Sequence, residues 1–285
     1  MHKRCVAHIV NLIVGDGLRK MNFSVDAIRN AVRYVRSSPQ RLECFKSCVE
    51  RVKGGCKELV VLDVPTRWNS TFMMLESALK FQKAFDRLGQ VDTHSYIGYF
   101  HLGEKNEKQG PPASNDWRNA EVFKEFLEPF YDITLRVCCS NSPTIHQTFG
   151  DLLHLHCVLQ EQKKSPSVGL MEDIVPPMEE KFYKYWGDFR KMNQYVFVAI
   201  VLDPRQKFER LVDYFEIAFG DMNEAPIEDQ RVEKLTYDVK DLLYDLFNVY
   251  VAEANLGKNV GASQESNKVV DEVHLEKGFS ENKGS

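Results

Sequence analysis

Residues 5–20, CVAHIVNLIVGDGLRK, show the dominant pattern of the chain. Val6, Ile9, Val10, Ile13 and Val14 recur every three or four positions, and this spacing predicts a helix that is buried on at least one side. Similar spacing predicts further helices in the rest of the sequence. They cover residues 24–36, 41–52 and 69–88, a stretch that opens at Asn115 or Asp116, a stretch after Pro143, and residues 171–186, 205–219 and 228–254.

Strand signals are few. Residues 59–62, LVVL, predict one strand or an extended packed segment, and residues 195–202 form a second short apolar run. Pro129 lies inside the helix that follows Asn115, where it should kink that helix or divide it in two. The expected fold class is therefore mainly α, a helical bundle or array with few or no strands.

Breaks in the apolar pattern divide the chain. Residues 90–115 contain closely spaced Gly and Pro residues among charged ones and are expected to form a flexible loop. Residues 255–285 are rich in Gly, Ser, Asn, Lys and Glu and are expected to be disordered. An N-terminal helical segment over residues 1–89 and a second helical region over residues 116–254 remain.

The composition restricts the partners. The formal net charge is −4, so no global basic field attracts nucleic acid and any DNA contact must use a local patch. The apolar-rich stretch from Ile9 to Val14 is far shorter than the roughly 20 residues of a spanning helix, so no membrane contact is expected. Seven cysteines, an odd number, indicate reduced thiols in the cytosol or nucleus.

Cys5 and His8 have the spacing of half a metal site on one helical turn. A second pair, Cys44 and Cys48, lies one turn apart on a later helix, so the two pairs together could hold zinc. Alternatively, all four are small buried thiols and a hydrogen-bonded histidine on apolar helix faces. Core packing is the favoured interpretation, and no metal or other cofactor is expected.

The segment Thr66-Arg67-Trp68-Asn69-Ser70 lies between a Pro-bounded extended run and a helix start. A tryptophan beside an arginine could stack on a splayed or flipped base while the guanidinium holds the DNA backbone. Alternatively, Trp68 anchors its helix to the core and Arg67 bonds helix-end carbonyls. Spacing alone favours packing, and both interpretations stay open.

Asp63 and Asp203 each follow a short apolar run, the position at which two-metal nucleases place their ligands. Both also precede a proline closely, and an Asp in such a turn commonly caps the amides that follow, so capping is favoured. Two groups of basic residues could be phosphate contacts or solvated faces. They are Arg29, Arg33, Arg36 and Arg41, and Lys181, Lys184, Arg190 and Lys191.

Six segments, taken in order, resemble the plant hAT-superfamily transposases of the ricesleeper and daysleeper type. They are CVAHIVNLIV (residues 5–14), AVRYVRSS (31–38), DVPTRWNST (63–71), Asp116-Trp117, KFYKYW (181–186) and VLDPRQK (201–207). One such motif would be a weak signal, but six in register over residues 1 to about 220 make a strong one.

This resemblance implies an RNase H-like catalytic core interrupted by a large helical insertion, with three acids that bind two divalent metals. In the family pattern two Asp lie upstream of the segment that matches Cys5 to His8, and the Glu lies in a C-terminal dimerisation region. These acids, that region and the DNA-reading BED zinc finger match no residues here, so a truncated chain without the active site is expected. Arg67 and Trp68 match the family's Arg-Trp pair, whose Trp helps to stabilise flipped-out flanking DNA.

The expected function is that of a transposase-derived DNA-binding protein in the nucleus that is not an enzyme by itself. Arg67 and Trp68 are the expected nucleic-acid-binding residues, and Cys5 and His8 are expected to be structural. The alternatives are a helical protein-interaction module without DNA binding and a fragment of an active hAT transposase. The expected partners are DNA and related transposase-like chains in homo- or hetero-dimers.

Overall fold

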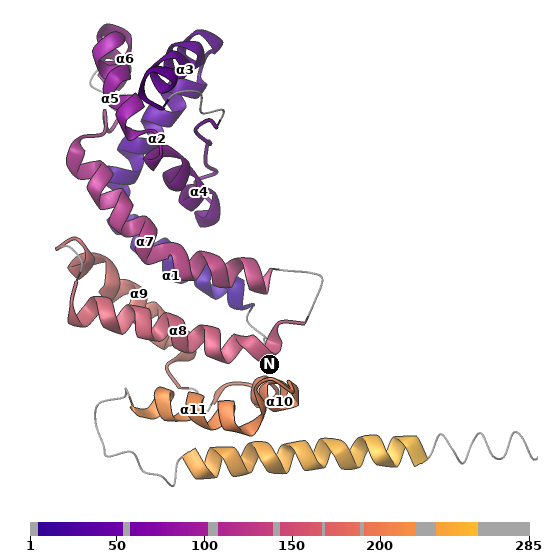
Figure 1. Cartoon of the computed structure of the whole chain (residues 1–285). Helices are drawn as coiled ribbons and strands as arrows, with labels where there is room; N and C mark the ends of the chain where they lie inside the picture. Colours follow the sequence, from indigo (N-terminus) through magenta and orange to yellow (C-terminus); the bar gives the residue numbers. More distant parts are fainter. Residues whose placement is uncertain are drawn as a thin grey trace, which may run out of the picture. The chain divides into compact units, whose positions relative to one another are not determined.

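A computed structural model gives the conformation of residues 5–53, 58–101, 108–138, 143–166, 169–188, 191–220 and 232–255 (Figure 1). Within these ranges the regular structure is helical and no strand forms, which confirms the mainly α fold class. No helix in the same ranges combines the length and the apolar character that crossing a membrane requires. The chain divides into two compact units, Met1–Asn193 and Gln194–Ser285.

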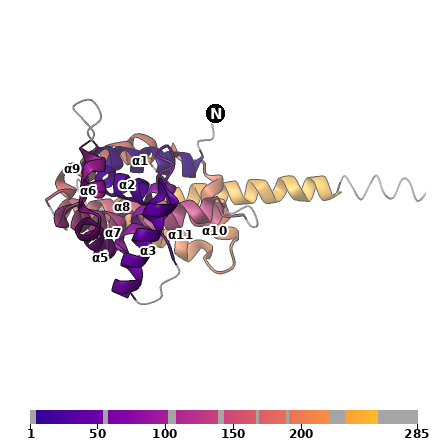
Figure 2. The same ribbon diagram turned by 90° about the horizontal axis from the view of Figure 1, so that it is seen from above.

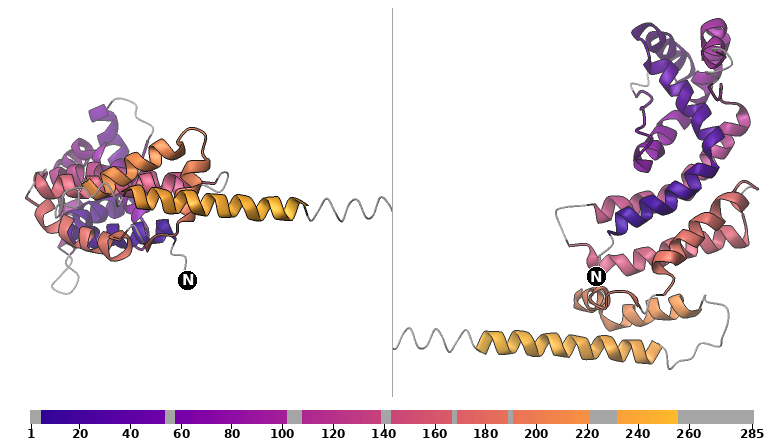
Figure 3. Two further views of the ribbon diagram at one scale, coloured as in Figure 1. Left: turned by 90° about the horizontal axis from the view of Figure 1, so that it is seen from below. Right: turned by 180° about the vertical axis from the view of Figure 1, so that it is seen from behind.

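The first unit contains the apolar helix that the opening residues predict. The helices of its described part are α1 (Val6–Lys20), α2 (Asn22–Arg36), α3 (Pro39–Lys53), α4 (Trp68–Leu79), α5 (Gln82–Val91), α6 (Thr93–Phe100), α7 (Ser114–Val137), α8 (Ile145–Lys164) and α9 (Met171–Trp186). Ile9, Val10, Ile13 and Val14 of α1 are fully buried, because α1 packs against both α7 and α9. Figures 1 and 3 show α1 and α7 side by side.

Helix α7 continues through Pro129, so the predicted alternative of two separate helices is wrong. Proline removes one backbone hydrogen bond from a helix interior, at a cost of about 3 kcal/mol. Phe126, Leu127, Phe130 and Ile133 around it are buried. Packing of this apolar face against α1, α2 and α4 offsets the lost hydrogen bond.

Two other sequence predictions for the first unit need correction. The single helix expected over residues 69–88 is two helices, α4 and α5, and the expected loop over residues 90–115 contains the end of α5 and all of α6. Residues 59–62 form neither a strand nor a helix, and Val60 is buried whereas Val61 and Leu62 are exposed. Residues 102–107 of the expected loop, and residues 256–285 of the expected disordered tail, lie outside the described residues.

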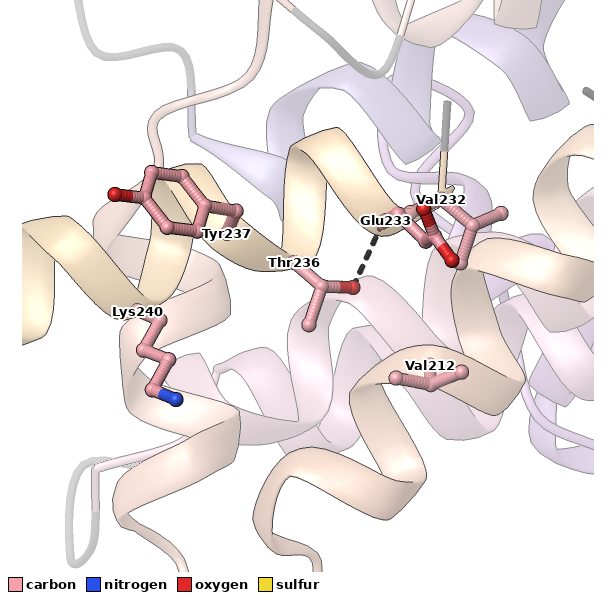
Figure 4. A pocket seen from close by; sticks show the side chains of 6 residues that line it. All are labelled: Val212, Val232, Glu233, Thr236, Tyr237 and Lys240. Atoms are coloured by element: carbon pink, nitrogen blue, oxygen red, sulfur yellow. Dashed lines mark hydrogen bonds between the residues drawn. The ribbon is translucent and has the colours of Figure 1, made fainter. Parts of the chain in front are cut away.

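The second unit contains α10 (Tyr195–Leu202), α11 (Lys207–Gly220) and a helix over residues 232–255, which Figure 2 shows from above as an unbroken rod. Phe197 of α10 and Phe215 of α11 meet edge to face, with ring centroids 5.1 Å apart. A cavity of about 300 Å³ lies between α11 and the last helix (Figure 4). Its lining is Val212, Val232, Glu233, Thr236, Tyr237 and Lys240, and the Thr236 hydroxyl donates to the Val232 carbonyl at 2.8 Å.

Helix α6 forms because its aromatic residues complete a cluster with α2, a tertiary contact that no local pattern reveals. Tyr96 and Phe100 are buried, and the Tyr96 ring meets the ring of fully buried Tyr34 at 5.1 Å between centroids. The Tyr34 hydroxyl donates to the carboxylate of Asp92, and the Arg41 guanidinium lies 4.2 Å from the Tyr34 ring centroid. Burial, with the nearby Asp92 carboxylate, raises the pKa of Tyr34 to about 12. Burial, with the Asp86 carboxylate, also raises the pKa of Tyr96.

This cluster should make stability depend on alkaline pH. In the unfolded chain Tyr34 loses its proton near pH 10, whereas the folded chain keeps it until about pH 12. The native state therefore binds more protons in this window, so the free energy of unfolding should fall as the pH rises from about 10 to about 12. Denaturant titrations at several pH values measure this slope. Tyr34→Phe should reduce it, whereas Tyr237→Phe, at an exposed tyrosine, should leave it unchanged.

Candidate nucleic-acid interface

A tight turn places Arg67 and Trp68 at the start of α4. The backbone N–H of Arg67 donates to the Val64 carbonyl at 2.8 Å, which closes the turn around Pro65 and Thr66. The Ser70 hydroxyl accepts the N–H of Val64 at 2.8 Å and donates to the Arg67 carbonyl at 2.7 Å. Ser70, which lies in the first turn of α4, thus stabilises the preceding turn through these two hydrogen bonds.

Trp68 is largely buried, with 5% of its surface exposed. Its ring meets Tyr131 of α7 edge to face at 6.2 Å between centroids, and Phe72 at 6.5 Å. Phe72 and Tyr131 stack on each other at 4.3 Å. These ring contacts join α4 to α7, as the packing interpretation of Trp68 expects.

Trp68 also lines a cavity of about 350 Å³ between α1, α2 and the start of α4. This volume is within the range of small-ligand sites. Its other lining residues are Asn11, Gly15, Leu18 and Arg19 of α1, Asn22, Val25 and Arg29 of α2, and Pro65, Thr66 and Thr71. Arg67 is exposed beside the cavity at the helix start. The structure therefore brings residues separated by about fifty positions to one polar cavity.

The carboxylate of Asp63 holds the segment before the turn against α2 and α4. Its carboxylate is wholly buried and accepts hydrogen bonds from Arg29 Nε at 2.8 Å and from the Thr71 hydroxyl at 3.0 Å. The carboxylate oxygen that accepts these bonds joins α2, the segment before the turn, and α4. The other oxygen has no hydrogen-bond partner in the described part of the chain, so the prediction that Asp63 caps the following amides is wrong.

Asp203 behaves as the sequence predicts. Its carboxylate accepts the backbone N–H of Arg205 at 3.0 Å and also binds the Arg205 guanidinium at 2.8 Å. This is turn capping by a short acidic side chain. Within the described residues, no three His, Cys, Asp or Glu side chains gather in a way that could hold a metal ion.

The predicted core positions of Cys5 and His8 need correction, because both side chains are exposed. Cys5 precedes the first turn of α1, and the buried face of that helix begins with Ile9 and Val10, which excludes His8 from the core. Cys48 of α3 is buried as predicted, and burial raises the pKa of its thiol.

The basic residues singled out in the sequence have different environments. Arg29 is paired with Asp63 and with half-exposed Asp26, and Arg41 lies over the Tyr34 ring. Arg33 and Arg36 are exposed on α2, the helix that also lines the cavity. In the second group Lys181 pairs with Asp16 at 3.1 Å and Lys191 with Asp188 at 3.3 Å, Lys184 is exposed, and Arg190 lies outside the described residues.

Breaking the buried pair should unfold the turn. Asp63→Ala leaves the largely buried Arg29 without its buried partner and removes the acceptor of Thr71, so we expect a loss of about 3 kcal/mol or more in the free energy of unfolding. Asp26→Ala is the matched control, since Asp26 pairs with the same arginine but is 46% exposed, and it should cost less than about 1 kcal/mol. Equal losses in chemical denaturation would contradict the special role of Asp63.

Comparison with known proteins matches both parts of the chain. The ZBED1 RNase-like helical domain matches residues 3–126, and the family described as hAT-like transposase, RNase-H fold, matches residues 146–250. The chain is 27% identical over 252 residues to the zinc finger BED domain-containing protein RICESLEEPER 1 of Oryza sativa subsp. japonica, covering 88% of this chain and 31% of that protein.

Two other relatives give the same result. The putative AC transposase of Zea mays is 28% identical over 234 residues, which cover 80% of this chain and 26% of the relative. The zinc finger BED domain-containing protein DAYSLEEPER of Arabidopsis thaliana is 27% identical over 210 residues, or 74% of this chain and 26% of its own. The chain thus spans less than a third of the length of these relatives. Along most of its length the chain is similar to hAT transposase-derived proteins of the ricesleeper and daysleeper type.

Proposed function

We propose that the chain binds DNA at the cavity beside Trp68, with Arg67 contacting the phosphate backbone, and that it does not cleave DNA by itself. One observation carries the proposal: Trp68 is fixed by ring contacts with Phe72 and Tyr131 and also lines a polar cavity. A tryptophan held in this way can stack on a base without losing side-chain entropy on binding. The exposed Arg67 guanidinium is the adjacent group that can bind a phosphate.

Charge supports a local contact of this kind. The net charge of −4 disfavours binding over the whole surface. Arg33 and Arg36 are exposed on α2, which supplies Asn22, Val25 and Arg29 to the cavity. A DNA strand with a base in the cavity could extend its phosphates toward these two arginines, and such contacts make affinity depend on salt.

The shape of the site favours an unpaired base over a duplex. A cavity of about 350 Å³ can accept a single extruded base, whereas a base pair within a stack cannot enter it. Stacking of one base on an aromatic side chain is worth about 1–3 kcal/mol. We therefore infer that DNA with an unpaired base is the preferred ligand.

Lack of cleavage is supported by the two acids that the sequence singled out. Asp63 is occupied by Arg29 and Thr71 in a wholly buried position, and Asp203 caps the turn at Arg205. The Asp63 side chain has no exposed surface and that of Asp203 is 7% exposed, so neither carboxylate is accessible to a catalytic metal in this conformation. Two-metal cleavage requires several such ligands around a pair of ions.

A helical protein-interaction module is the second candidate function. It is favoured by the helix over residues 232–255, on which Tyr244, Phe247 and Tyr250 are each about 60% exposed or more. Exposed aromatic residues in this number are typical of protein contacts. Titration with salt separates the two functions, because real phosphate contacts give a falling log K against log salt and a protein-interaction module gives no DNA binding. The DNA-binding proposal also includes a location in the nucleus and the formation of dimers with related transposase-like chains.

Loss of the Trp68 ring should affect DNA with an unpaired base more than plain duplex. We expect Trp68→Leu to weaken binding to a duplex with one bulged nucleotide by about tenfold, with little change for the fully paired duplex. Fluorescence anisotropy with labelled DNA at fixed salt measures both affinities.

Trp186→Leu is the control for this experiment. Trp186 is also a nearly buried tryptophan, 8% exposed, but it lies on α9 and does not line the cavity. Both variants lose core packing, so a comparable loss of bulge binding in the two would identify Trp68 as structural only. Circular dichroism of each variant confirms that its helices remain.

Cleavage assays test the second half of the proposal. Incubation of the purified chain with Mg²⁺ or Mn²⁺ and hairpin-forming DNA ends should leave the DNA intact, as judged on denaturing gels. Metal-dependent nicking that disappears in Asp63→Asn or Asp203→Asn, while circular dichroism shows that the helices remain, would show that these acids are catalytic after all.

A further inference from the structure

We infer that the cavity beside Trp68 reads the hydrogen-bonding edge of the unpaired base, through the side-chain amides of Asn11 and Asn22. The inference rests on the proposed function, and it adds the chemical identity of the groups that recognise the base. An indole ring can stack on any base, because every base has an aromatic face. Selectivity must therefore come from polar groups around the edge of the base.

Asn11 and Asn22 are the amides of the cavity. Asn11 interrupts the apolar pattern of α1, on a helix whose neighbouring residues Ile9, Val10 and Ile13 are fully buried. Asn22 is the first residue of α2 and lines the same cavity. Neither side chain makes a hydrogen bond within the described part of the chain, in contrast to Asn30, which donates to the Gln109 carbonyl at 3.0 Å.

Three of the other polar side chains of the cavity, those of Arg19, Arg29 and Thr71, are already paired. Arg29 is held by Asp63 and Asp26, and Arg19 pairs with Asp16. Thr71 donates to Asp63, as described above. Only Thr66 joins the two amides as a polar lining residue without a hydrogen bond from its side chain among the described residues.

The pairing of the cavity's arginines with carboxylates favours an uncharged ligand over a phosphate. Because the arginines of the cavity wall face carboxylates, their charge is neutralised and the cavity has little attraction for a phosphate. A carboxamide offers two N–H donors and a carbonyl acceptor side by side. That pattern complements the adjacent donor and acceptor on the edge of an uncharged base, and one such bidentate contact changes affinity by about 5- to 150-fold.

The experiment uses three duplexes that differ at one bulged position. The first has thymine there, the second has difluorotoluene, which has the shape of thymine but no comparable hydrogen-bonding edge, and the third has an abasic site. We expect the chain to bind thymine at least about fivefold more tightly than difluorotoluene, and difluorotoluene more tightly than the abasic site. The difference in affinity between thymine and difluorotoluene measures the contact with the asparagine amides. The difference between difluorotoluene and the abasic site measures stacking on Trp68.

Variants assign the first difference to the proposed residues. The double variant Asn11→Ala, Asn22→Ala should bind thymine and difluorotoluene equally while it still prefers both to the abasic site. Asn248→Ala, at an exposed asparagine of the last helix, should keep the fivefold preference. Thermal unfolding of each variant shows whether the fold is retained, and the single variants replace the double one if it is not.

The outcomes separate this inference from the proposed function. Equal binding of thymine and difluorotoluene by the unsubstituted chain, with weaker binding of the abasic site, overturns the base-edge contact and leaves the stacking site standing. A thymine preference that survives in the asparagine variants also overturns it. Equal binding of all three duplexes, or no salt-dependent binding at all, overturns the proposed function itself.

Discussion

The ion pair between Arg29 and Asp63 is the constraint on which the candidate site depends. A carboxylate with no exposed surface is unfavourable unless a charged partner and hydrogen bonds compensate for its lost hydration, and Arg29 with Thr71 supplies both. The pair fixes the segment before Trp68 to α2 and α4 at once. Since α2 and α4 also contribute to the cavity, any shift of this pair would change the cavity and the position of Trp68 together.

Trp68 shows how packing and ligand binding can use one side chain. The sequence interpretations treated them as alternatives, but Trp68 both contacts Tyr131 and lines the cavity. An aromatic ring that stacks on a base loses little entropy on binding only if it is already rigid. Packing in the protein core provides that rigidity. Burial of the tryptophan is therefore compatible with a role in binding and is the physical condition for it.

The sequence predicts helices well where one helix face is apolar. Met171–Trp186 and the apolar face of α1 follow directly from their spacing. Prediction from the sequence fails where tertiary contacts determine the structure. Helix α6 is an example, because its aromatic residues are ordered by Tyr34, some sixty positions away. The segment around Arg67 and Trp68 was visible as a motif, and its partners were not. Arg29 and Asp63 are 34 positions apart, and no local pattern links them.

Asn11 shows what kind of signal a sequence does contain for such a site. A half-buried amide such as Asn11 within an apolar helix is expected at the border of a cavity or of solvent, because a fully buried amide without a partner costs free energy. The interruption of the run from Ile9 to Val14 is therefore informative, although the sequence cannot say which other element closes the cavity. The Arg29–Asp63 pair holds the segment before Trp68 against α2, and Pro65, Thr66 and Trp68 line the same cavity as Asn11.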